Sequence, residues 1–133
     1  MIQCFKLKQK QEGLIMHKKK ETIKPVMIEN MKGGKKYVQR FSSIGEDDFN
    51  PNAEVVSRLV LIPGASIGYH EHVGNEEVIT VLSGTGHCVD DGEEYELEAG
   101  DVTICREHHH HGIENTSETE ELVLMAVVIK VTE

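Results

Sequence analysis

The chain has 133 residues, which suits one domain with a hydrophobic core, and its apolar fraction of 38% is ordinary for a soluble protein. Its net charge of −9 is unevenly spread: residues 1–40 hold 11 of 14 basic and 3 of 23 acidic residues, a balance of +8, which leaves −17 for the remainder. An acidic body repels phosphate backbones, and no apolar run approaches the ~20 residues of a membrane span. These features argue against a nucleic-acid-binding or membrane protein.

The cysteines and the first residues of the chain indicate the cellular compartment of the protein. The three cysteines are an odd number without CxxC spacing, which is typical of reduced thiols rather than of a disulfide framework. The first residues, MIQCFKLKQKQ, lack the apolar segment of an export signal. The sequence therefore predicts a cytoplasmic protein.

The N-terminal part is polar and rich in lysine. Residues 1–36 show no sustained apolar period, so they predict a basic arm with at most a short strand near residues 25–28. We expect this arm to be solvated, although a basic segment could also contact an acidic surface. The folded domain is expected to occupy residues 37–133.

The first 15 residues carry a separate hypothesis. The tripeptide QEG at residues 11–13 can be encoded by CAG-GAG-GGN, which contains the bacterial ribosome-binding sequence AGGAGG. A two-residue spacer and Met16 follow it. We therefore expect that translation begins at Met16 and that residues 1–15 are an artefact of the gene model.

Short β-prone runs separated by turn signals follow. The expected strands cover residues 54–62, 77–82, 85–90, 93–97, 102–105, 110–115 and 122–131. Pro-Gly, Ser-Gly, Asp-Asp-Gly and Ala-Gly sequences separate several of them. Short strands at regular spacing, with no helical period between them, indicate an all-β sandwich or barrel.

Two spaced blocks of glycine and histidine lie among these strands. The first has the spacing G-x5-H-x-H-x4-E-x6-G and falls on Gly64, His70, His72, Glu77 and Gly84. The second has the spacing G-x5-R-x-H-x2-H-x3-N and falls on Gly100, Arg106, His108, His111 and Asn115. With both blocks in this order, the chain resembles the cupin family over about residues 54–130. The second block departs from the family, which usually has Pro where Arg106 stands and Gly where His108 stands.

The resemblance implies a fold, a cofactor and a partner. The fold is a double-stranded β-helix, the jelly-roll barrel of cupins, and the cofactor is one divalent transition-metal ion, with Mn or Fe favoured. A homodimer is expected from the family and because small barrels have edge strands to cover. The β-prone stretches at residues 37–41 and 54–62 could extend the sheet of a partner.

The spacing also has a direct physical interpretation. In a strand, residues i and i+2 point to the same face, so His70 and His72 would project together. Glu77 opens the next expected strand, where a hairpin can carry its carboxylate back beside them, and His111 arrives from a later strand. Three imidazoles and one carboxylate suit Mn, Fe, Co, Ni, Cu or Zn and leave two positions open on an octahedral ion. The alternative is a set of surface polar residues around turns.

Strand geometry and the motif spacing of the family decide which of several neighbouring glutamates and histidines is the expected ligand. Glu76 and Glu77 are adjacent, so a strand sends them to opposite faces, and the spacing to the next glycine selects Glu77. Within the four histidines at residues 108–111, the register selects His111. His109 shares its parity and is a candidate for the mouth of the pocket.

The resemblance leaves two classes of function open. Cupins with this ligand set include oxalate decarboxylases and oxidases, dioxygenases, sugar-phosphate isomerases and binding proteins, and the chain resembles small bacterial cupins described as oxalate decarboxylase-like. The first expectation is a metalloenzyme acting on a small carboxylate or sugar-type substrate, and the alternative is a non-catalytic, metal-dependent binding or sensing module. No catalytic residue is assigned, but Arg106 is a candidate contact for a carboxylate.

Overall fold

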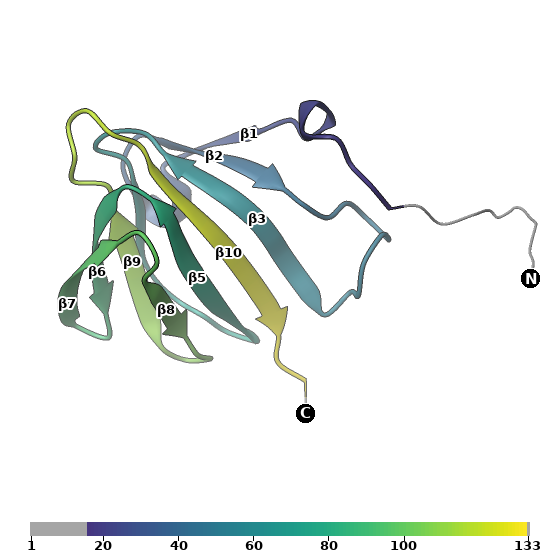
Figure 1. Cartoon of the computed structure of the whole chain (residues 1–133). Helices are drawn as coiled ribbons and strands as arrows, with labels where there is room; N and C mark the ends of the chain where they lie inside the picture. The colour runs from purple at the N-terminus through teal and green to yellow at the C-terminus, as the bar shows by residue number, and fades with distance from the viewer. Residues whose placement is uncertain (1–15, 133) are drawn as a thin grey trace, which may run out of the picture.

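The computed structural model describes residues 16–132 as two antiparallel sheets that face each other (Figure 1). The larger sheet has the strand order β1-β2-β3-β10-β5-β8, and the smaller has the order β4-β9-β6-β7. The larger sheet comprises β1 (Val26–Glu29), β2 (Tyr37–Ser42), β3 (Ala53–Leu61), β10 (Leu122–Lys130), β5 (Asn75–Ser83) and β8 (Val102–Cys105). The smaller comprises β4 (Ser66–Glu71), β9 (His110–Glu114), β6 (Thr85–Asp90) and β7 (Glu93–Glu98). Two short 3₁₀ turns, η2 (Lys20–Thr22) and η3 (Met31–Gly33), lie before β1 and β2.

Alternation of side chains along the strands builds the core between the sheets. In β10, Leu122, Leu124 and Ala126 are fully buried, whereas the residues between them are only partly buried. Such alternation fixes the register, because a slip of one residue would turn the apolar set toward solvent. The core is completed by Leu59, Leu61, Ile79, Val81, Ile67, Cys88, Leu97 and Ile113. The all-β jelly-roll prediction is confirmed.

Seven strands agree with the seven expected runs, and β1 and β2 fall on the short strand and the β-prone stretch expected before them. β4 was not among the expected strands, because its sequence, SIGYHE, lacks a β-branched run. It forms through pairing with β9, in which His70 lies opposite His111. β5 begins at Asn75, so Glu77 lies inside the strand rather than at its start. The hypothesis about residues 1–15 falls outside the described residues.

The strand order corrects one expectation about pairing with a partner. β2, which covers residues 37–41, lies between β1 and β3, and β3, which covers most of residues 54–62, lies between β2 and β10. An interior strand has no free edge, so neither strand can extend the sheet of a second chain. Among the described strands, the edges of the larger sheet are β1 and β8. No helix in residues 16–132 is long and apolar enough to cross a membrane.

The segment before β2 packs directly on β4. A Cβ atom on Gly34 would lie 2.0 Å from the Ser66 carbonyl oxygen, and one on Gly68 would lie 2.1 Å from the Lys32 carbonyl oxygen. Only glycine allows two backbones to approach this closely. The contact therefore fixes η3 beside the strand that carries His70.

Asn115, the last residue of the second block, has a structural role. Its buried side-chain amide donates hydrogen bonds to the carbonyl oxygens of Leu61 at 2.9 Å and Glu120 at 2.8 Å. Its Oδ1 accepts a hydrogen bond from the Ser117 backbone at 3.0 Å. Asn115 thus joins the end of β3 to the loop between β9 and β10.

Candidate metal centre

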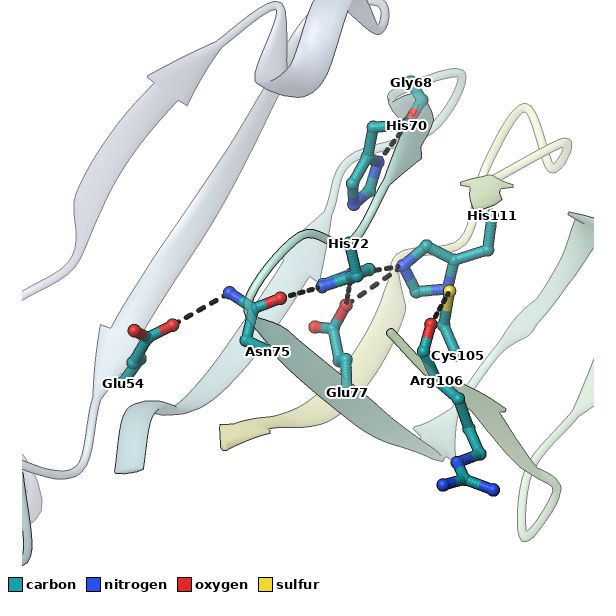
Figure 2. A network of polar contacts seen from close by, with 9 residues as sticks. All are labelled: Glu54, Gly68, His70, His72, Asn75, Glu77, Cys105, Arg106 and His111. Carbon is teal, nitrogen blue, oxygen red and sulfur yellow. Dashed lines mark hydrogen bonds and ion pairs between the residues drawn. The ribbon is translucent and has the colours of Figure 1, made fainter. Parts of the chain in front are cut away.

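Four side chains converge between the two sheets (Figure 2). His70 comes from β4, His72 follows the end of that strand, Glu77 lies in β5 and His111 lies in β9. One nitrogen or oxygen atom from each lies within 4.8 Å of the corresponding atoms of the others, a grouping that could hold a metal ion. Hairpin folding and the β4–β9 pairing therefore bring together the residues that the spacing singled out.

The distances among three of the four side chains match adjacent ligands of an octahedral ion. His72 Nε2 and His111 Nε2 lie 3.1 and 3.0 Å from Glu77 Oε1, and the two nitrogens are 3.1 Å apart. Adjacent ligands about 2.1 Å from an ion are separated by about 3.0 Å in an octahedron and by about 3.4 Å in a tetrahedron. The observed spacing therefore fits adjacent octahedral positions.

Hydrogen bonds to Nδ1 of His70 and His72 select the tautomer in which Nε2 is free to bind a metal. His70 Nδ1 donates to the Gly68 carbonyl oxygen at 2.7 Å, and His72 Nδ1 donates to Asn75 Oδ1 at 2.6 Å. Asn75 Nδ2 donates in turn to Glu54 Oε1 at 2.8 Å, which fixes the orientation of the amide. In the neutral imidazoles, the lone pair is then on Nε2, and in His72 this atom faces Glu77 and His111.

The charges in the group respond to this crowding. Burial alone would raise the pKa of Glu77, but hydrogen bonds from His111 and His72 lower it to about 2. The hydrogen bond to Glu77 raises the pKa of His72, against the opposing effect of burial. Burial lowers the pKa of His70, and the nearby positive charge of Lys32 adds a smaller effect in the same direction. An ionised carboxylate facing imidazole nitrogens attracts a proton or a metal ion.

The third histidine differs from the other two. His111 is buried, and its Nδ1 has no hydrogen-bond partner among the described residues. The β4–β9 pairing places it opposite His70, and the two strands pack closely here, because a Cβ atom on Gly112 would lie 3.0 Å from the Tyr69 backbone nitrogen. The place of His111 in the group therefore depends on strand pairing and not on a hydrogen bond to Nδ1.

A cavity of about 210 Å³ opens beside the group. Drug-sized pockets usually measure ~300–1,000 Å³, so this one suits a small molecule. Its apolar walls include Val55, Leu59, Ile67, Ile79, Ile113 and Val128. Three charged side chains besides Glu77 also line it: Lys32, Arg40 and Glu54. A polar ligand could thus bind at one end of a largely apolar chamber.

The structure separates the neighbouring candidates. Glu76 lies 4.0 Å from Arg106, whose side chain is 75% exposed, and neither residue lines the cavity. The candidate role of Arg106 as a contact for a bound carboxylate is therefore wrong for this cavity. His109 bonds to Asp91 at the surface and is also outside the cavity, because the turn before β9 directs it outward.

Four residues near the centre were not found by sequence reasoning. Asn75 and Glu54 support His72, and Lys32 and Arg40 line the cavity. Lys32 and Arg40 precede both histidine blocks, and their positions depend on contacts that no local pattern encodes. Asn75 lies within the first block, but at a position where the spacing specifies no residue type.

We predict that Glu77→Gln lowers the pKa of His72 in metal-free protein, because the hydrogen bond to Glu77 is the largest effect that raises it above 6.5. The raised His72 pKa stabilises the fold below pH 6.5, and the lowered Glu77 pKa stabilises it above pH 4.5. The variant should therefore lose most stability between these values. Histidine NMR titration and denaturation measure both effects, with Glu76→Gln as the control. An unchanged His72 pKa in Glu77→Gln would contradict the assignment.

Comparison with known proteins identifies the family. The cupin domain profile matches residues 57–128. The oxalate-binding protein of Thermotoga maritima is 36% identical over 118 residues, which cover 89% of this chain and 97% of that protein. The crystal structure of a predicted oxalate decarboxylase from Thermotoga maritima is 34% identical, with a TM-score of 0.79 over 85% of this chain and 97% of that one. An RmlC-like cupin from Shewanella frigidimarina is 21% identical, with a TM-score of 0.63 over 87% and 91% of the two chains, and shares the fold. The chain belongs to the cupin family.

Proposed function

We propose that this cupin binds a small carboxylate in a metal-dependent manner, on an ion held by His70, His72, Glu77 and His111. The observation that carries the proposal is the group of four side chains whose ligand atoms lie within 4.8 Å of one another, three of them only 3.0–3.1 Å apart. Hydrogen bonds from Nδ1 of His70 and His72 leave Nε2 of both neutral rings free to bind an ion. The small cavity beside these atoms supports a small ligand. The name of the Thermotoga maritima relative, an oxalate-binding protein, supports a carboxylate.

The ligand set narrows the choice of metal. Octahedral spacing with three nitrogen donors and one oxygen donor favours Mn or Fe over a closed tetrahedral zinc site. When bound, such an ion would act as a Lewis acid toward carboxylate oxygens at its two remaining positions. The protein itself supplies the fixed donor atoms, the apolar walls and the charged side chains.

Turnover is the second candidate function, and Glu54 is the observation that favours it. Apart from Glu77, Glu54 is the one carboxylate among the described residues that line the cavity. A carboxylate in this position could exchange a proton with a bound ligand. In that case the protein would be a metalloenzyme acting on a small carboxylate, and Glu54→Gln would abolish turnover while ligand binding remained.

The metal assignment predicts opposite results for two pairs of neighbouring substitutions. His70→Ala and Glu77→Ala should each lose most of the bound ion, because each removes one of four ligands. His108→Ala and Glu76→Ala should retain it, because these side chains lie outside the cavity. Metal content is measured by plasma mass spectrometry on protein purified without an affinity resin.

Affinity for the ion in wild-type protein should also fall as the pH drops through the histidine range near ~6.5, since protons compete for the imidazoles. Unchanged metal content in both His70→Ala and Glu77→Ala would rule out this ligand set.

We also propose that the protein is a cytoplasmic homodimer. Cys88 and Cys105 are buried free thiols, which suits a reducing compartment.

The outward face of the larger sheet carries a row of apolar side chains across four adjacent strands: Ile104, Val78, Val127 and Val56. Ile104 is 58% exposed at the β8 edge. An apolar sheet face of this kind supports a two-fold interface.

Light scattering at micromolar concentration tests the dimer. Wild-type protein should have the mass of two chains, and Ile104→Glu should shift it toward one chain, because the new charge would lie without a partner in the proposed apolar interface. Phe49→Glu is the matched control, since Phe49 is an exposed apolar residue outside the outward face of the sheet. A wild-type mass of one chain would refute the proposal.

A further inference from the structure

We infer that Lys32 and Arg40 form a cationic wall of the cavity that selects a short dicarboxylate dianion. This inference rests on the proposed function and adds the residues that set charge specificity. The oxygen atoms of the ligand that are not bound to the ion would face these two side chains. Both residues lie outside residues 57–128, the part of the chain that matches the cupin domain.

Lys32 is positioned by the contact between η3 and β4. Its carbonyl oxygen lies against Gly68, where a Cβ atom would be only 2.1 Å away from that oxygen. The Gly68 carbonyl oxygen in turn accepts the hydrogen bond from His70 Nδ1 at 2.7 Å. One backbone position therefore links the orientation of His70 to the location of Lys32. The Lys32 side chain lines the same cavity as His70 and His72.

Arg40 is positioned by the register of β2. It pairs with Leu59, whose side chain is buried and lines the cavity, and it shares a strand face with Val38, which is fully buried. Arg40 therefore points inward, between the sheets, on an otherwise apolar face. No ion pair joins it to another residue within the described part of the chain, 16–132. A half-buried guanidinium aimed into a cavity is well suited to bind an anion.

The charges around the cavity indicate a doubly negative ligand. Lys32 and Arg40 contribute two positive charges, which Glu54 and Glu77 balance. A divalent ion with neutral imidazoles would then leave a local charge of +2, although the whole chain carries −9. Residues 41–133, which carry a balance of −17, repel anions, whereas this chamber attracts them. A short dicarboxylate would neutralise the site, and a monocarboxylate would not.

Calorimetry with two isosteric probes tests the inference. Manganese-loaded full-length protein is titrated with oxalate, a dianion, and with oxamate, a monoanion of similar size. Lys32→Gln and Arg40→Gln should each weaken oxalate binding about tenfold or more and oxamate binding less, because each removes a charge-assisted contact. Arg40→Lys should keep the preference for oxalate. Lys130→Gln and Arg106→Gln are controls, since both residues lie outside the cavity.

Metal content separates failure of the inference from failure of the proposed function. Every variant should retain the same manganese content as wild type, because neither Lys32 nor Arg40 belongs to the proposed ligand set. Unchanged oxalate affinity in both Gln variants, with full metal content, would overturn the inference and leave the proposed function standing. A wild-type protein that binds no manganese, or that binds neither probe when loaded, would overturn both.

Discussion

Electrostatic crowding at the centre of the barrel is the constraint on which the rest of the structure depends. Imidazole nitrogens of His72 and His111 and a carboxylate oxygen of Glu77 lie about 3 Å from one another in a mostly apolar interior. Electron-rich atoms at this distance are unfavourable unless a proton or a cation lies among them. The raised pKa of His72 is the response of the protein when a proton fills that role.

The fold keeps these atoms together by three devices. Antiparallel pairing places His70 directly opposite His111. A hydrogen-bonded chain from Glu54 through Asn75 orients His72, and the Gly68 carbonyl oxygen orients His70. Close-packed Leu, Ile and Val side chains on both sheets keep the surroundings rigid and apolar. A site held by strands and by hydrogen bonds to its ligands needs little reorganisation to accept an ion.

Much of this could be predicted from sequence, because the relevant signals are local or lie at fixed spacings. β-Prone runs bounded by turn signals indicated most of the strands, and parity separated Glu77, which faces the cavity, from Glu76, which pairs with Arg106 at the surface. What could not be predicted depends on contacts between distant segments. Lys32 reaches the cavity only because Gly34 and Gly68 allow η3 to pack on β4. Arg106 stands within the second block in sequence, yet its turn directs it outward, so proximity along the chain was misleading.

The segment before β3 therefore contributes to the site, because it supplies Lys32 and Arg40, which lie outside the two histidine blocks. The proposed ion ligands come from the matched cupin region, whereas the two cations come from before it. In such an arrangement, the matched cupin region would bind the metal ion, and the segment before β3 would determine which anion binds to it. Relatives that share the ligands could then differ in ligand preference through the segment before β3.

X-ray absorption spectroscopy of the metal-loaded protein tests the central claim most directly, because it reports the ligands of the ion whatever the ligand or reaction. The account predicts one ion per chain with six light-atom neighbours at about 2.0–2.2 Å, three of which show imidazole scattering. Four-coordinate geometry, a sulfur neighbour or fewer than three imidazoles would contradict it.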